Sequence, residues 1–185
     1  MLPYSLARVN TVVMLHAAAP LATSDIAHAA ALAYAPARSA LATLEKRGII
    51  RRSRRAGRDR YGPNRDSLHY PMAYLTALVD LPVADALRGE RVSAVYAYGR
   101  IAQPNDSTRQ SDLDLLIVGE IEDPGGLVAR LVIMGSRLGR AVVPLILTDD
   151  QLDRANQRGD GQVAAALGGV QIFGDRPGGG RPEPT

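Results

Sequence analysis

The chain has 185 residues, of which 46% are hydrophobic and 22% are charged. These proportions are typical of a soluble globular protein with one domain or two small ones, and they exclude a chain that is disordered throughout. The absence of cysteine excludes disulfide scaffolds and thiolate zinc sites, and no apolar run reaches the roughly 20 residues that span a bilayer. Because no signal peptide is recognisable at the N-terminus, we expect a cytoplasmic protein with no membrane partner.

The net charge of +3 is unevenly distributed along the chain. Residues 1–80 contain 11 Lys and Arg against 5 Asp and Glu, whereas residues 81–185 contain 11 against 14. Eight basic residues fall between positions 46 and 60, where Asp59 is the only acid. Such a run attracts polyanions through phosphate neutralisation, although a solvated basic loop is an equally common interpretation of charge alone.

Three helices are predicted at the start of the chain. Apolar residues at helical spacing predict the first over Tyr4–Ala18, and Thr23 or Ser24 is expected to cap a short second helix. After a turn at Tyr34–Ala35, a third helix is predicted over Pro36–Arg47. The outward face of the third helix is predicted to carry small or long hydrogen-bonding side chains, namely Arg38, Ser39, Thr43 and Lys46.

A β-hairpin is predicted directly after the third helix. One strand starts at Gly48, a turn follows at Ala56 and Gly57, and a second strand runs through Tyr61. The hairpin carries most of the arginines of this basic run: Arg51, Arg52, Arg54, Arg55, Arg58 and Arg60. Arginines placed in this way suit contacts with a nucleic-acid backbone or minor groove.

The segment LATLEKRGIIRRSRRAGRDRYGPN, residues 41–64, resembles the winged helix-turn-helix domains of bacterial transcriptional regulators. The resemblance implies a DNA-binding domain over residues 1–66 that binds double-stranded DNA, commonly as a homodimer. It also implies that Arg38, Ser39, Thr43 and Lys46 read bases, and that the hairpin arginines contact the backbone. Another interpretation of the basic half is an interaction module that binds RNA instead of DNA.

Linker helices are predicted over residues 67–90. The main one spans about Leu68–Leu81 and is followed by Pro82. Its predicted apolar side consists of Leu68, Met72, Leu75, Leu78 and Val79. This helix either completes the first core or connects it to a second domain, and the sequence does not separate the two interpretations.

The second half begins with two predicted strands, residues 92–98 and 111–118. Gly99 and Arg100 follow the first strand, and the second opens with Ser111-Asp112-Leu113-Asp114. Residues two apart on a strand share a face, so we expect the two carboxylates to lie side by side. A divalent cation that also binds nucleotide phosphates is the usual reason for tolerating such a pair.

The remaining predicted elements alternate between helices and strands up to residue 174. They are a helix over Pro124–Leu138, a strand over Ala141–Leu147, a helix capped by Thr148 and Gln151, a helix over Gly159–Leu167 and a strand over Val170–Gly174. The Pro- and Gly-rich tail, residues 175–185, is predicted to be disordered.

The segment YAYGRIAQPNDSTRQSDLDLLIVGE, residues 96–120, resembles the nucleotidyltransferase superfamily, especially its minimal members and relatives of kanamycin nucleotidyltransferase. The resemblance implies an α/β (α+β) chain in which a small mixed-sheet domain, residues 91–174, follows the winged helix. It assigns nucleotide binding to Gly99, Arg100 and Ser111, and magnesium binding to Asp112 and Asp114. The implied cofactor is magnesium with a nucleoside triphosphate.

Two departures from that pattern bear on activity. Arg100 stands where the family has serine, and the third family carboxylate, expected at about Val143, is missing because no acid occurs between Pro124 and Thr148. We therefore expect a catalytically impaired domain used for dimerisation or for sensing a nucleotide or other small-molecule effector, rather than an efficient enzyme. The alternative is a magnesium-dependent, antitoxin-like nucleotidyltransferase that modifies a protein or small molecule.

Overall fold

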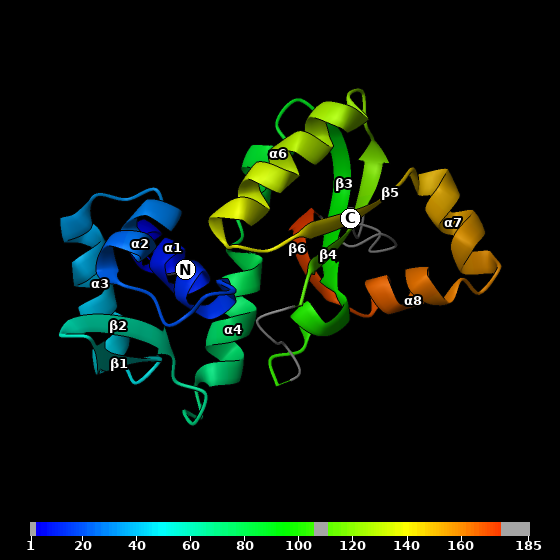
Figure 1. Ribbon diagram of the computed structural model, residues 1–185. Coiled ribbons are helices and arrows are strands. Elements are labelled where there is room, and N and C mark those ends of the chain that lie inside the picture. The colour runs from blue at the N-terminus through cyan, green and yellow to red at the C-terminus, as the bar shows by residue number, and fades with distance from the viewer. Residues whose placement is uncertain (1–2, 106–110, 175–185) are drawn as a thin grey trace, which may run out of the picture.

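Three helices and a β-hairpin form the N-terminal part of the computed structural model, which describes residues 3–105 and 111–174 (Figure 1). Their bounds are α1 Tyr4–Leu15, α2 Thr23–Ala29, α3 Tyr34–Lys46, β1 Ile50–Arg55 and β2 Arg58–Pro63. The helices pack around side chains that the helical spacing had marked as apolar, such as Val9, Val13 and Leu41, all of which are fully buried. The three predicted helices and the predicted hairpin are therefore all present in this part of the chain.

The ends of the first three helices differ from the sequence prediction. Helix α1 ends at Leu15 rather than Ala18, because the backbone becomes extended at His16. Helix α2 has Ala22 rather than Thr23 or Ser24 at its N-cap, and the Asp25 carboxylate accepts the Ala22 N–H at 3.3 Å. Helix α3 includes the predicted turn at residues 34–35, since a proline is tolerated in a first turn whose N–H groups have no helical partner.

The hairpin is closed by a turn whose backbone has a left-handed conformation at two residues. Ala56 has φ 50° and Gly57 has φ 74°, the combination that a type I′ turn requires and that matches the twist of paired strands. At the base of the hairpin, Leu21 pairs with Tyr61 through reciprocal backbone hydrogen bonds of 2.9 and 2.8 Å. The α1–α2 connection thus adds a third, very short strand to the sheet and anchors β2 to the helices.

Helix α4, Tyr70–Val79, lies between the N-terminal part and the larger sheet (Figure 1). It is shorter than the predicted Leu68–Leu81, and the prediction of its buried face was wrong. Of the five residues predicted as its apolar side, Leu78 alone is fully buried, while Leu68, Met72 and Val79 are 97%, 69% and 50% exposed. The buried face instead consists of Tyr70, Ala73, Tyr74, Ala77 and Leu78.

Hydrogen bonds explain why α4 presents this other face to the core. The side chains of Asn10 and Thr11 on α1 donate to the carbonyl oxygens of Ala73 and Ala77, whose small side chains allow α1 to approach closely. On the same face, the Tyr74 hydroxyl donates to the Ile101 carbonyl at 3.1 Å. Polar partners on neighbouring elements therefore decide the orientation of α4, and apolar periodicity alone does not contain that information.

The second half is built on a four-stranded mixed sheet with the order β5-β4-β3-β6. Strands β4 and β5 are parallel, and β3 is antiparallel to both β4 and β6. The bounds are α5 Val83–Ala86, β3 Arg91–Tyr98, the 3₁₀ turn η1 Gly99–Ala102, β4 Leu113–Glu120, α6 Pro124–Arg137, β5 Val142–Leu147, α7 Asp149–Gln157, α8 Gly161–Leu167 and β6 Val170–Gly174. The two sheets with their helices confirm the predicted mixed α/β fold class.

Local signals in the second half agree with the structure more closely than those of α4. The Thr148 hydroxyl accepts the Gln151 N–H while the Gln151 side chain accepts the Thr148 N–H, so the predicted capping box is present. Strand β4 starts at Leu113 rather than at Ser111, which leaves Asp112 just outside the strand. The predicted disordered tail, residues 175–185, lies outside the described residues.

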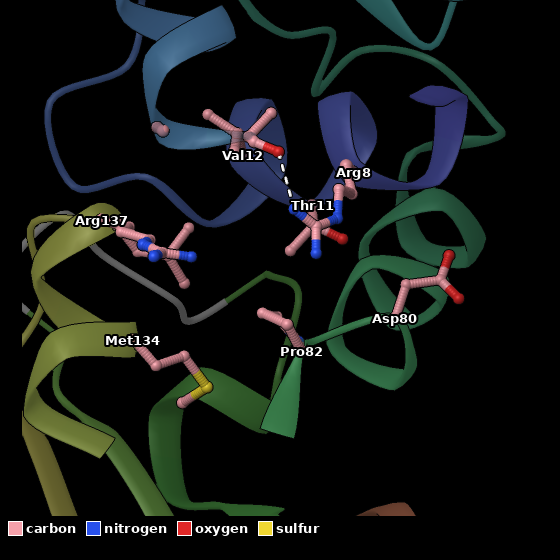
Figure 2. Close-up of a pocket in the computed structure, with 10 residues that line it drawn as sticks. Arg8, Thr11, Val12, Asp80, Pro82, Met134 and Arg137 are labelled. Carbon is pink, nitrogen blue, oxygen red and sulfur yellow. Dashed lines mark hydrogen bonds between the residues drawn. The ribbon is translucent and has the colours of Figure 1, made fainter. Parts of the chain in front are cut away.

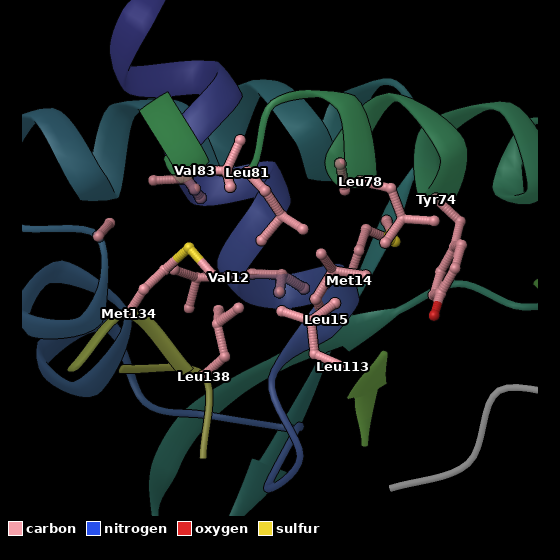
Figure 3. Packing of buried hydrophobic residues seen from close by; sticks show 14 of the residues in the cluster. Val12, Met14, Leu15, Tyr74, Leu78, Leu81, Val83, Leu113, Met134 and Leu138 are labelled. Carbon is pink, nitrogen blue, oxygen red and sulfur yellow. The ribbon is translucent and has the colours of Figure 1, made fainter. Parts of the chain in front are cut away.

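Helices cover both faces of this sheet. On one face, β-strand residues such as Leu115 and Ile117 join a core that includes Leu131 of α6 and the helices of the N-terminal part. On the other face, Leu116 and Val118 pack with side chains of α7 and α8. Figure 3 shows that the first core is continuous between the two halves of the chain, because residues of α1, α4, α6 and β4 meet in it.

Candidate nucleic-acid interface

Helix α3 packs against the core with one side and exposes the other side to solvent. Ala37, Ala40, Leu41 and Leu44 are buried against the rest of the N-terminal part. The opposite face exposes Arg38, Ser39 and Lys46, as the sequence predicts. Thr43 is half-buried, and its hydroxyl donates to the Ser39 carbonyl at 3.0 Å, so this predicted base contact has less freedom than the other three.

The hairpin arginines divide into two sets according to whether an acid holds them. In the first set, Arg52 contacts Glu45 of α3 at 3.2 Å and Asp59 of β2 at 3.5 Å. These two carboxylates raise the pKa of the Arg52 guanidinium. Arg60 contacts Asp25 of α2 at 3.4 Å, and Arg51 contacts Asp66 at 3.6 Å. Arg52 and Arg60 therefore tie the hairpin to helices α3 and α2.

The second set consists of Arg54, Arg55 and Arg58, which surround the turn of the hairpin. All three side chains are exposed, and none of the ion pairs between described residues includes them. The Arg54 Nε donates to the Gly57 carbonyl at 3.4 Å, which keeps that side chain near the turn. Their charge is therefore not compensated by a close carboxylate, in contrast to that of Arg52 and Arg60.

A groove of about 600 Å³ lies between α3, the start of α2 and the hairpin. It brings together predicted site residues that are distant in sequence, since Arg38 of α3 and both Arg52 and Arg58 of the hairpin line it. The groove also contains Thr23, Ser24 and Tyr34, which the sequence suggested only as capping and turn residues. Nothing in their local pattern distinguishes a groove-lining hydroxyl from an ordinary helix-capping residue.

The second predicted site, at the start of β4, is also assembled in part. Gly99 has φ 69°, and a Cβ at this position would lie 2.7 Å from the Asp114 Oδ2, so the turn and the carboxylate are in close approach. Burial and the neighbouring Asp112 carboxylate raise the pKa of Asp114, and Arg100 opposes that shift. Gly99, Arg100, Asp112 and Asp114 therefore form one cluster, although Asp112 precedes the strand instead of sharing it.

Ser111 differs from the other residues predicted to bind nucleotide. It is 3% exposed, and its carbonyl oxygen accepts a hydrogen bond from the Arg140 guanidinium. The same guanidinium donates to the Leu15 carbonyl at the end of α1, and burial lowers the pKa of Arg140. Ser111 thus belongs to a buried connection between the two halves of the chain.

The carboxylate cluster lacks a third acid on the adjacent strand. In the parallel pairing of β4 with β5, Asp114 is opposite Val143, the position that the sequence indicated for the missing carboxylate. Among residues 3–105 and 111–174, no group of three or more His, Asp or Glu side chains is placed to hold a metal ion. Two carboxylates and a valine do not fit a two-ion magnesium centre, which needs several oxygen ligands for each ion.

A small cavity lies where the two halves meet. Figure 2 shows Arg8 and Thr11 of α1, Asp80 and Pro82 after α4, and Met134 of α6 around it. The cavity measures about 30 Å³, which is space for a water molecule rather than for an organic effector. Burial raises the pKa of Asp80, whose Oδ2 has no hydrogen-bond partner among the described residues.

Comparison with protein families finds one match that coincides with the helices and hairpin described above. Residues 8–59 match the FaeA-like protein family, a winged-helix-like DNA-binding family. The match extends from α1 into β2 and includes no residue of the four-stranded sheet. No curated protein and no solved structure matches the chain. In the part of the chain that the structure describes, no helix is long and apolar enough to cross a membrane.

Proposed function

We propose that the protein is a transcriptional regulator that binds double-stranded DNA through its N-terminal part. The observation that carries this proposal is the groove in which Arg38 of α3 and Arg58 of the hairpin meet, with the uncompensated Arg54 and Arg55 exposed beside the same turn. A helix with long polar side chains enters a major groove, and cations beside it neutralise the flanking phosphates. The match of residues 8–59 to the FaeA-like family and the basic charge of the N-terminal half support the same conclusion.

The two sets of residues have different roles in this proposal. Arg38, Ser39 and Lys46 contact base edges, while Thr43 contributes less because its hydroxyl is bonded within the helix. Arg54, Arg55 and Arg58 contact phosphates. Arg52 and Arg60 are positioning residues, since their ion pairs with α3 and α2 hold the hairpin at the correct distance from the recognition helix.

For the second half we propose a catalytically impaired, nucleotidyltransferase-like domain over residues 91–174, connected by residues 67–90 to a DNA-binding domain over 1–66. Its role is dimerisation or ligand sensing. The valine opposite Asp114 supports impaired catalysis, because an acceptor hydroxyl beside that strand has no carboxylate to take its proton. The continuous core between the halves supports a coupled role, since a change at one half is transmitted through packed side chains.

The close approach of Gly99 to Asp114 favours a second candidate, a magnesium-dependent nucleotidyltransferase of the antitoxin-like kind. Calorimetry with magnesium and each nucleoside triphosphate tests it, using an Asp112→Asn, Asp114→Asn variant as the control. Magnesium-dependent binding that the variant abolishes would favour this candidate. We expect no such binding, because the described residues bring only two carboxylates together in the cluster.

The DNA proposal is tested by fluorescence anisotropy with specific and unrelated duplexes. We expect Arg38→Ala combined with Lys46→Ala to weaken specific binding by at least tenfold and to reduce discrimination between the duplexes. Arg88→Ala combined with Arg154→Ala is the matched two-charge control, because both are exposed arginines outside the N-terminal part. Unchanged discrimination in the α3 variant would contradict the assignment of α3 as the recognition helix.

A further inference from the structure

Helix α4 is apolar on both of its sides. Its sequence, YPMAYLTALV, contains no charged residue, yet the face opposite the core is open to solvent. Met72 and Val79 on that face are 69% and 50% exposed, and Leu68 just before the helix is 97% exposed. A helix that is hydrophobic all round is normally buried all round, so the exposed side is unusual for a surface helix.

The exposed residues are spaced as in a helix-packing seam. Leu68, Met72, Leu75 and Val79 follow one another at intervals of four, three and four residues, and Leu75 is half-buried and also packs against the core of its own chain. At 3.6 residues per turn the three helical positions, Met72, Leu75 and Val79, fall within about 60° of one another, on the side opposite Tyr70, Ala73 and Ala77, and Leu68 precedes the helix. Apolar residues at alternating intervals of four and three are the pattern by which two helices pack along their length.

Among the described residues, Leu68, Met72 and Val79 stay largely exposed, and together with Leu75 they form the seam, which we define as residues 68, 72, 75 and 79. The segments outside the described residues near and after the second half, residues 106–110 and 175–185, contain no Leu, Ile, Val, Met or aromatic residue. Their composition therefore lacks the side chains that would bury an apolar stripe. Neither segment can bury the seam, and an exposed apolar stripe is typical of a contact with another molecule.

We propose that the seam packs against the seam of a second copy, with the two α4 helices antiparallel across a two-fold axis. A two-fold contact places the same patch on both sides, and an uncharged patch meets its copy without like-charge repulsion. Helix α4 has no acidic residue in its first turn and no basic residue in its last turn, so its dipole is not compensated by charges on the helix itself. An antiparallel copy places a helix C-terminus beside each N-terminus and compensates both ends.

The size of the seam sets the strength of the contact. Stable dimers bury roughly 1,200–2,000 Å² in total, more than a few side chains per copy provide. The association is therefore concentration-dependent, and two DNA half-sites would strengthen it by holding the copies close together. Strengthening on DNA rests on the proposed function, whereas self-association without DNA does not, and the two are measured separately.

The first test is light scattering without DNA over a range of concentrations. We expect the wild type to move toward twice its mass of 19.7 kDa, and Leu68→Lys combined with Met72→Lys to weaken self-association at least tenfold. The control is Ile133→Lys, because Ile133 is a similarly exposed apolar residue on α6, 58% exposed, outside the seam. Circular dichroism and thermal melting check that each variant is folded. A monomeric wild type at all concentrations, or a dimer that only Ile133→Lys disrupts, would overturn the proposal.

The second test exploits the absence of cysteine from the chain, since an introduced cysteine is then the sole thiol. Antiparallel seams place residue 68 of one copy near residue 79 of the other. We expect a mixture of Leu68→Cys and Val79→Cys chains to form the mixed disulfide dimer faster than either chain alone forms its own. Faster self-linking of Leu68→Cys would refute the antiparallel arrangement. DNA affinity of the Leu68→Lys, Met72→Lys variant, measured on a single half-site, reports on the proposed function independently.

Discussion

Removing the uncompensated arginines of the hairpin is the perturbation that most directly separates phosphate contact from a merely basic surface. Arg54→Ala combined with Arg55→Ala removes two exposed charges that no carboxylate among the described residues holds. Neither side chain is buried, so the hairpin keeps its register with β2 and its turn. The variant therefore changes the electrostatic contact while leaving the position of α3 intact.

The magnitude follows from counterion release. Each phosphate neutralised on duplex DNA contributes about 0.9 to the slope of log K against log salt, so losing two contacts flattens the slope by about 2. At about 0.1 M salt the same two contacts contribute on the order of 50-fold in affinity. Because phosphates carry no sequence information, specific and unrelated duplexes should lose affinity by similar factors.

The assay is anisotropy titration at four or more salt concentrations with both kinds of duplex. The control is Arg88→Ala combined with Arg154→Ala, which removes the same net charge from exposed positions in the second half. We expect the slope for the control to equal the wild-type slope, apart from the small change that any loss of two positive charges produces. A slope that is unchanged in the hairpin variant, or reduced equally in the control, would refute the assignment of these arginines to phosphate contact.

Three further predictions concern stability. Leu44→Ala should lower the free energy of unfolding by about 2–5 kcal/mol in urea titrations, because Leu44 is fully buried on the inner face of α3. A loss below about 1 kcal/mol would contradict that packing. Ala56→Gly should raise it by up to about 1 kcal/mol by relieving the positive φ of Ala56, and a destabilised variant would contradict the turn assignment. Asp114→Asn should raise the Tm at pH 7. The pKa of Asp114 is raised on folding, so ionisation costs stability as the pH rises, and the gain should vanish below the ordinary carboxyl pKa of 3.8. A Tm gain that persists at pH 3, or a wild-type Tm that magnesium raises at pH 7, would contradict this last prediction.

Local signals in the sequence predicted a good part of the fold. A Thr and a Gln three residues apart predicted the capping box of α7, and Ala56-Gly57 predicted the hairpin turn, because both depend on residues adjacent in the chain. The position of the missing carboxylate was also accessible, since Val143 is opposite Asp114 in the sheet register. The capping box and the hairpin turn are decided by short-range chemistry.

Features that depend on partners distant in the chain were not predictable in the same way. Apolar spacing marked a side of α4 that is largely exposed, and hydrogen bonds from Asn10 and Thr11 hold the opposite side against the core. The arginines of the hairpin are indistinguishable in the sequence, whereas the structure separates them by their contacts with Glu45 and Asp25. Charge runs predict a basic surface, and only the three-dimensional arrangement shows which of its cations are already paired.

We propose that this protein binds a specific DNA sequence through α3 and the hairpin. A gel-shift titration against duplex DNA from upstream of its own coding sequence, at several salt concentrations, tests it most directly. Unrelated duplex and structured RNA serve as competitors. We expect a complex that survives an excess of both competitors. Binding that is weak, steeply salt-dependent and abolished by either competitor would contradict it and leave the hairpin as a general polyanion surface.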